Sequence, residues 1–199
     1  MPDPVTPLGH ETFDGFARIR EIGPLGMVTL RAAPDRPELA AALAAAGGLP
    51  VPGVRRLARA GDRAVAWMGP DEFLLILPYP EVPATLAALT AALGAAPHLA
   101  ADMSDARVVL AVEGARADQV LAKLTPADLD ALEADEIRRT RLAQVACALW
   151  REGDGFRLIA FRSVARYAMD LLIRAAQPGS ELRGARGAGA FPASVPARA

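Results

Sequence analysis

Two histidines and one cysteine are the residues of this 199-residue chain with the clearest capacity for metal binding or nucleophilic catalysis: His10, His98 and Cys147. A protein zinc site gathers three or four ligands, and neither histidine has a second histidine or a cysteine near it in the sequence. Cys147 lies in an apolar stretch, 145–149, where a thiol behaves as a small buried hydrophobic group. Only a histidine distant in the sequence could activate it as a base. We therefore expect no metal site and disfavour a cysteine nucleophile.

Two acidic groups could act as general acids or bases. Asp71 and Glu72 follow Gly69-Pro70, and adjacent residues of a turn rarely face one target, so we interpret them as turn residues. The second group, Asp102-Met103-Ser104-Asp105, precedes a predicted strand that begins at Arg107. These side chains could cap or pair across a junction between two halves of the chain, or they could line a ligand cleft. We favour the structural role, because local bonds to the backbone explain these residue types.

Glycine-rich and arginine-rich segments complete the candidates. The stretch Gly184-Ala185-Arg186-Gly187-Ala188-Gly189 follows no predicted strand and opens no periodic helix, so it lacks the scaffold of a phosphate-binding loop. Arg138, Arg139 and Arg141 form a basic cluster that is typical of a solvated or ion-paired surface. From the residues alone we expect no catalytic, cofactor-binding or metal-binding residues in this chain.

The composition is typical of a soluble globular protein of one domain. Hydrophobic residues make up 52% of the chain, charged residues make up 23%, and the formal net charge is -1. Such a charge argues against nucleic acid as a partner, because phosphate binding needs a basic field. A single cysteine excludes an intrachain disulfide. We see no secretory signal, and the apolar stretches are shorter than the roughly 20 residues of a membrane span. We expect a cytoplasmic protein with no membrane partner.

The predicted strands and helices that position these residues occur in the same order twice along the chain. In the first part we predict a strand at 27–31, a helix at 37–46, a hairpin of strands 64–68 and 73–77, and a helix at 83–93. In the second part we predict a strand at 107–112, a helix at 116–124, a further helix start at 125–128 with a polar connector, a hairpin of strands 145–150 and 156–161, and a helix at 163–176.

The repeated order predicts an internal duplication. It matches Val28 with Val109, Trp67 with Trp150 and Leu75 with Ile159 at nearly constant spacing. We predict an α+β fold of two pseudo-repeated βαββα halves, about 13–100 and 101–176, with antiparallel or mixed sheets packed into one body. Chance recurrence of such hairpins is the alternative. The Pro-rich residues 1–12 and the Gly-, Ala- and Arg-rich residues 177–199 predict a flexible N-terminal arm and C-terminal tail.

Five segments resemble the gamma subunits of heterotetrameric sarcosine oxidases, and together they span nearly the whole predicted body. They are Gly26-Met27-Val28-Thr29-Leu30-Arg31, the Trp67-Met68-Gly69-Pro70-Asp71-Glu72-Phe73-Leu74-Leu75 hairpin, Asp102-Met103-Ser104-Asp105-Ala106-Arg107, Leu124-Thr125-Pro126-Ala127-Asp128-Leu129, and Thr140-Arg141-Leu142 with the segment 155–172. The Asp102-Met103-Ser104 run is similar to the Asp-Leu-Ser strand start of the folate-binding half of the glycine-cleavage T-protein. The resemblance therefore implies a fold like the folate-binding domain of aminomethyltransferases.

What the resemblance implies for function is a non-catalytic, structural gamma subunit. The assembled enzyme oxidatively demethylates sarcosine to glycine, with oxygen as acceptor and folate able to receive the one-carbon unit. The partners would be the alpha, beta and delta subunits, with the main contact to alpha. FAD, FMN, NAD, folate and zinc would belong to those partner subunits, and this chain would hold no cofactor.

Two alternatives stay open. A gamma-like subunit of a sister complex could serve another N-methyl amino acid, such as N-methylglutamate, because this subunit would not contact the substrate in either complex. A stand-alone, folate-binding aminomethyltransferase-like protein or repair factor would need a carboxylate for the pterin, for which Asp102 and Asp105 are the candidates.

Overall fold

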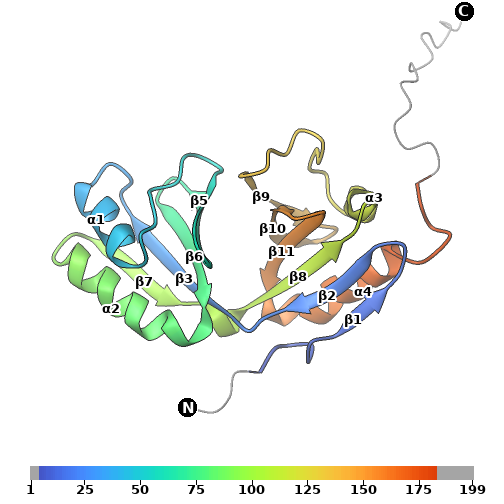
Figure 1. Cartoon of the computed structure of the whole chain (residues 1–199), viewed down its shortest axis with the longest axis horizontal. Coiled ribbons are helices and arrows are strands. Elements are labelled where there is room, and N and C mark those ends of the chain that lie inside the picture. Colours follow the sequence, from blue (N-terminus) through green and yellow to red (C-terminus); the bar gives the residue numbers. More distant parts are fainter. Residues whose placement is uncertain (1–4, 183–199) are drawn as a thin grey trace, which may run out of the picture.

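The computed structural model describes residues 5–182, and its strands form two sheets (Figure 1). The first sheet has the order β4 (Leu57–Ala60), β5 (Arg63–Gly69), β6 (Glu72–Pro78), β3 (Leu25–Ala32) and β7 (His98–Asp102). The second has the order β1 (Thr12–Asp14), β2 (Arg18–Ile22), β8 (Arg107–Glu113), β11 (Gly155–Phe161), β10 (Val145–Glu152) and β9 (Ile137–Leu142). Every neighbouring pair within these sheets is antiparallel. An α+β fold with antiparallel sheets is therefore confirmed.

Within residues 5–182, four α-helices cover the outer faces of the two sheets. They are α1 (Pro37–Ala45), α2 (Val82–Leu93), α3 (Ala117–Ala122) and α4 (Ala165–Ala175). The buried residues of α1 and α2 pack with the first sheet, and those of α3 and α4 pack with the second. A third apolar cluster contains only strand residues from both sheets. The body therefore has the layer order helices, sheet, sheet, helices.

Strand β6 shows why the hairpin sequences are apolar without a break. Phe73, Leu75 and Leu77 pack toward α1 and α2, while Leu74 and Ile76 pack toward the second sheet. Successive side chains of a strand point to opposite faces, so a strand that is covered on both faces needs apolar residues at consecutive positions. The structure confirms the predicted hairpins and the predicted helices at 37–46 and 83–93.

The internal duplication is visible in the order of the strands, although the residue-by-residue match made from the sequence was wrong. Val28 and Leu75 pair on the face of the first sheet that packs against the helices, whereas Val109 and Ile159 pair on the face of the second sheet that packs against the first. The order β4-β5-β6-β3-β7 corresponds to β9-β10-β11-β8-β2, and β1 extends the second sheet by one further strand. Two pseudo-equivalent halves are therefore confirmed.

The N-terminal strands do not stay with the first half. The sequence boundary assigns residues 13–22 to it, whereas β1 and β2 join the second sheet through pairing of β2 with β8 (Figure 1). In the first sheet, the place equivalent to β2 is taken by β7, which follows α2 in the chain. The two sheets thus exchange edge strands around the connection between the halves.

Some local predictions were wrong. The helix start expected at 125–128 is a set of turns, in which the Thr125 hydroxyl accepts a hydrogen bond from the Ala127 amide at 3.3 Å and Asp128 accepts one from the Asp130 amide at 3.0 Å. The polar connector after it contains β9. This strand was not predicted, because four of its six residues are Arg or Thr and it lacks an apolar pattern. Strands β4 and β7 were also missed, because both are short and lie at a sheet edge.

The described part of the N-terminal segment is packed on the body. The sequence predicts a flexible arm at 1–12, whereas the backbone amides of Leu8 and His10 donate hydrogen bonds to the buried Glu21 carboxylate at 3.1 and 2.8 Å. Thr6 is buried as well. Residues 1–4 and most of the predicted C-terminal tail, 183–199, lie outside the described residues.

Candidate functional site

The histidines and the cysteine identified in the sequence lie apart in separate environments. His10 is an exposed residue of the N-terminal segment, and His98 opens β7, where its Nδ1 lies 2.8 Å from the Ala96 carbonyl oxygen. Cys147 packs in the core between the second sheet and its helices, and burial raises the pKa of its thiol to about 12. A thiol with so high a pKa stays protonated at neutral pH and is a poor nucleophile. Across residues 5–182, no group of three His, Cys, Asp or Glu residues is placed to hold a metal ion.

The turn carboxylates and the basic cluster meet across the two halves. Asp71 and Glu72 both lie 3.5 Å from the Arg31 guanidinium. Glu72 also lies 3.4 Å from Nη1 of Arg139, and the same nitrogen donates to the Met68 carbonyl oxygen at 2.5 Å. Arg139 therefore bridges β9 to the β5–β6 turn. The pattern is an ion-pair network of the kind expected from turn chemistry and a basic surface.

The group around Ser104 ties the connection between the halves to β3. The Ser104 hydroxyl donates to Oδ1 of Asp102 at 2.6 Å and accepts a hydrogen bond from the Met27 amide at 3.0 Å. Ser104 is buried, so its loss would leave a buried amide without a partner. This local bonding is the structural role favoured for the segment from its sequence.

A small hollow lies beside this connection. It has room for about a water molecule. Its lining comes from the N-terminal segment, β2, β3, β8 and the turn after β11, and includes Thr6, Ile22, Leu25, Ser104, Asp105 and Arg162. A pterin would need a much larger pocket, since ligand sites usually enclose several hundred Å³. Asp105 therefore lines a hollow too small for a pterin, and Asp102 is not part of its lining.

Arg107 lines the hollow and begins β8, two residues before Val109 of the layer between the sheets. Its guanidinium stacks 4.4 Å from the centre of the Phe161 ring, and its Nε is buried without a hydrogen-bond partner among the described residues. Burial lowers the pKa of Arg107, and the charge on Glu72 partly offsets that effect. Phe161 itself is 46% exposed.

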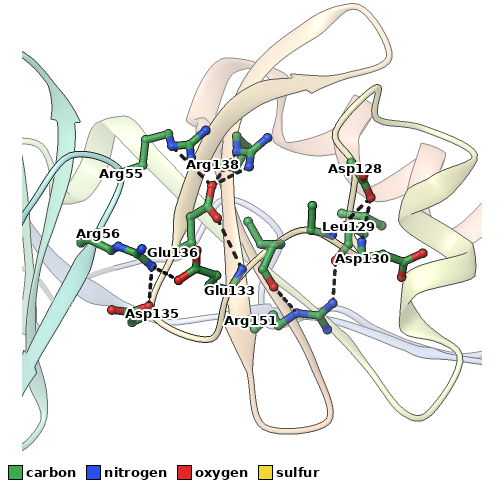
Figure 2. Close-up of polar contacts among 12 residues, drawn as sticks. Arg55, Arg56, Asp128, Leu129, Asp130, Glu133, Asp135, Glu136, Arg138 and Arg151 are labelled. Carbon is green, nitrogen blue, oxygen red and sulfur yellow. Dashed lines mark hydrogen bonds and ion pairs between the residues drawn. The ribbon is translucent and has the colours of Figure 1, made fainter.

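A polar network joins the loop before β4 to the loop before β9, and sequence reasoning missed it (Figure 2). We call it the clasp, and its members are Arg55, Arg56, Glu133, Asp135, Glu136 and Arg138. Arg56 Nη1 lies 2.6 Å from Glu133 and 2.8 Å from Asp135. The backbone crosses the same gap, because the Leu57 amide donates to the Asp135 carbonyl at 2.8 Å and the Ile137 amide donates to the Arg55 carbonyl at 3.0 Å. The clasp thus connects the outer edges of both sheets.

Glu136 is the buried centre of the clasp. Arg138 donates two hydrogen bonds to its Oε1, at 2.8 and 2.6 Å, and Arg55 lies 3.6 Å away. Burial alone would raise the pKa of Glu136, but the hydrogen bonds from Arg138 and the Glu133 amide, with the charges of Arg138 and Arg55, more than offset burial and lower that pKa. Glu136 therefore stays ionised, and Arg55 is its ion-pair partner from the first half.

The loop 124–136 is also held from its other end. Arg151 donates to the carbonyl oxygens of Leu129 and Leu132 at 2.6 and 3.0 Å, and both leucines are buried (Figure 2). An acidic run at 133–136 followed by a basic run at 138–141 was the signal in the sequence, although nothing in it identifies Arg55 and Arg56 as partners. The polar groups of this region are used in holding the fold together.

Large apolar side chains are exposed at several places on the surface. They are Val5, Val51, Val54, Leu99, Phe161, Tyr167 and Leu182. Tyr167 lies on the exposed side of α4, which buries Ala165, Ala168, Met169, Leu172 and Ala175. No helix within 5–182 is both long enough and apolar enough to cross a membrane.

Comparison with known proteins adds sequence relatives of closely similar length. The family described as "Sarcosine oxidase, gamma subunit family" matches residues 31–177. A sarcosine oxidase subunit gamma of Corynebacterium sp. strain U-96 is 38% identical over 161 residues, which cover 79% of this chain and 78% of that protein. The corresponding subunit of an Arthrobacter species is 40% identical over 143 residues, or 70% of each chain.

Solved structures show the same fold. A chain of heterotetrameric sarcosine oxidase from Corynebacterium sp. U-96, determined in complex with pyrrole 2-carboxylate, superposes with a TM-score of 0.77 at 35% identity, covering 87% of this chain and 94% of that one. The glycine cleavage system aminomethyltransferase T of Bartonella henselae superposes with a TM-score of 0.62 at 16% identity, covering 88% of this chain and 59% of that protein. The second likeness shows a shared fold alone.

Proposed function

This chain belongs to the sarcosine oxidase gamma subunit family, and from that premise we propose that it is the non-catalytic, structural gamma subunit of a heterotetrameric sarcosine oxidase. The observation that carries the proposal is the family relationship, which spans most of both chains at close to 40% identity. The complex would oxidatively demethylate sarcosine to glycine, with folate able to receive the one-carbon unit.

The use of its reactive side chains supports a structural role. Cys147 has a strongly raised pKa, and Ser104 with Asp102 bonds the backbone of β3. Glu136 and its arginines hold the two halves together. General acid–base or nucleophilic catalysis needs such groups to converge on a place where a substrate can sit, and the hollow beside Ser104 is about the size of a water molecule.

The proposal assigns FAD, FMN, NAD, folate and zinc to the partner subunits, and none of them to this chain. It also names the alpha subunit as the main contact among alpha, beta and delta. Exposed apolar side chains such as Leu99 and Phe161 support a surface made for a permanent partner, because permanent interfaces are large and more apolar than ordinary surface.

Co-expression of the tagged chain with the subunits encoded beside it tests the proposal. We expect the chain alone to be poorly soluble and inactive, and the purified complex to consume oxygen when sarcosine is added. A preference for N-methylglutamate would instead identify the sister complex. The chain alone turning over sarcosine, or retaining a flavin through purification, would refute the structural assignment.

Substitutions in the assembled complex sharpen the test. His10→Ala and His98→Ala each remove an imidazole, and Asp105→Asn removes a carboxylate, that sequence reasoning considered for chemistry. A structural subunit predicts that turnover of sarcosine and its apparent affinity stay within about twofold of the unsubstituted complex, since general acid–base groups contribute about 10²- to 10⁴-fold. A fall in turnover by two orders of magnitude or more, with normal assembly, would place that residue in the active site.

A further inference from the structure

The outer strand of the first sheet, β7, has an edge that no other described strand covers. It lies at the end of the order β4-β5-β6-β3-β7 and pairs with β3 alone (Figure 1). An uncovered edge strand presents unpaired N–H and C=O groups to any other extended chain. Native proteins protect such edges by shortness, by charges, by bulges or by covering segments.

The other three edges of the two sheets are protected in these ways. Strand β1 is only three residues long. Strand β9 carries Arg138, Arg139 and Arg141, and β4 is tied to the second sheet through the Arg56–Glu136 bridge and the clasp. By contrast, β7 has the sequence His-Leu-Ala-Ala-Asp, with its one carboxylate at its end. Its edge is therefore the least protected of the four.

The backbone groups that β7 presents can be identified from the register. The Met103 amide donates to the Met27 carbonyl at 2.8 Å, so odd-numbered residues of this segment bond toward β3. Hydrogen-bonded and non-bonded positions alternate in an antiparallel pair, and Val28 opposite Asp102 and Leu30 opposite Ala100 are the non-bonded ones. The amides and carbonyls of Ala100 and Asp102 therefore point away from the sheet.

The second half of the molecule shows what covers the equivalent edge. Strand β2 occupies the place that corresponds to β7, and β1 is added to it as an antiparallel strand with Phe13 opposite Ile19. Strand β1 comes from the N-terminal segment, before the first element of the repeat. Among residues 5–182 no such segment lies beside β7, so no described part of this chain takes the corresponding place in the first sheet.

We propose that β7 accepts an extended segment of a partner subunit as an added antiparallel strand. This inference rests on the proposed function, because it assumes that the chain assembles with partner subunits. The amides and carbonyls of Ala100 and Asp102 would pair with that segment. Leu99 points to the opposite face from Ala100 and is 53% exposed. The incoming segment would therefore carry an apolar side chain beside Leu99, since neighbouring side chains on one face of a sheet contact each other.

Hydrogen exchange in the assembled complex, read at single amides by fragmentation mass spectrometry, tests this directly. The amides of Leu99 and Ala101, which bond to β3, are the internal reference. We expect Ala100 and Asp102 to exchange at least about tenfold more slowly than unprotected amides, because each would gain a hydrogen bond. Rapid exchange at Ala100 and Asp102 beside a protected Leu99 and Ala101 would overturn the proposal and leave the proposed function standing.

A pair of matched variants tests the surface independently. Leu99→Lys places a charge on the free strand, and Val54→Lys makes the same change at an apolar residue that is 68% exposed away from β7. We expect Leu99→Lys to weaken assembly about tenfold or more and Val54→Lys to leave it unchanged. Equal assembly of both variants would overturn the proposal.

Two further outcomes are distinguishable. A homodimer of this chain with protected Ala100 and Asp102 would show that a second copy takes the edge, which would overturn the assignment to a partner subunit. Failure of the unsubstituted chain to assemble with any neighbouring subunit would refute the proposed function, and this inference with it.

Discussion

Replacement of Glu136 by glutamine should loosen the connection between the two halves. The change keeps the shape of a buried side chain and removes the charge that Arg138 of the same half contacts at 2.8 and 2.6 Å and that Arg55 of the first half approaches at 3.6 Å. These contacts fix the segment 135–137, whose backbone makes the hydrogen bonds across the gap. Hydrogen bonds to charged groups contribute about 1.5–3 kcal/mol each. Since glutamine retains one acceptor, we expect a loss of about 2 kcal/mol in the local free energy of opening.

The assay is hydrogen exchange at the two amides that cross the gap, those of Leu57 and Ile137. Every 1.4 kcal/mol corresponds to a factor of ten in an equilibrium constant, so both amides should exchange about 30-fold faster in Glu136→Gln. The matched control is Glu133→Gln, whose carboxylate is 62% exposed in its pair with Arg56. Exposed pairs contribute little, and we expect no more than about a threefold change.

The pH dependence of the same amide exchange is a second test of the role of the Glu136 charge. The pKa of Glu136 is lower in the folded protein than in the unfolded chain. The stabilisation is therefore complete above the unfolded value of about 4.3 and is lost as the pH falls through the folded value. The difference in exchange rate of the Leu57 and Ile137 amides between the unsubstituted protein and Glu136→Gln should therefore become smaller below about pH 4. Equal exchange in Glu136→Gln and Glu133→Gln at pH 7 would refute the view that a buried charge holds the halves.

Three other changes follow from the packing. Ser104→Ala leaves the buried Met27 amide without its acceptor and should cost about 1–3 kcal/mol of unfolding free energy in denaturant titrations, whereas Ser104→Thr should recover part of it. Gly155→Ala places a Cβ against the Val112 carbonyl oxygen, so the β8–β11 pair must shift, and the thermal midpoint should fall by several degrees. Cys147 should resist iodoacetamide in the folded protein at pH 8 and react in denaturant, because burial raises its pKa to about 12; rapid labelling in the folded state would contradict that burial.

Prediction from the sequence succeeded where one face or both faces of an element are buried. Strand β6 and its partner β5 are apolar at nearly every position, and α2 places Val82, Leu89 and Leu93 on one stripe. Periodicity reports burial, so these elements could be located, and their recurrence indicated the duplication. The same argument explains the misses, because β7 and β9 are edge strands whose residues are short or charged.

The candidate site residues also divide into those whose surroundings the local sequence shows and those whose partners are distant in the chain. The sequence suffices to show that His10, His98 and Cys147 have no ligand or base beside them in the chain, and to relate Ser104 and Asp102 to local bonding. It does not show that Arg139 reaches Glu72, or that Arg56 reaches Glu133 and Asp135. Those pairs join residues that only the packing of one half on the other brings together.

The sequence by itself determined the repeated order of strands and helices. The apolar faces of each repeat must be buried, and the spacing of apolar residues along the chain shows which faces these are. Only the tertiary structure decided which sheet receives β2, how the clasp closes around Glu136, and that β7 has a free edge. These features depend on contacts between residues far apart in the chain, and the side-chain spacing along one segment carries no information about its distant partner.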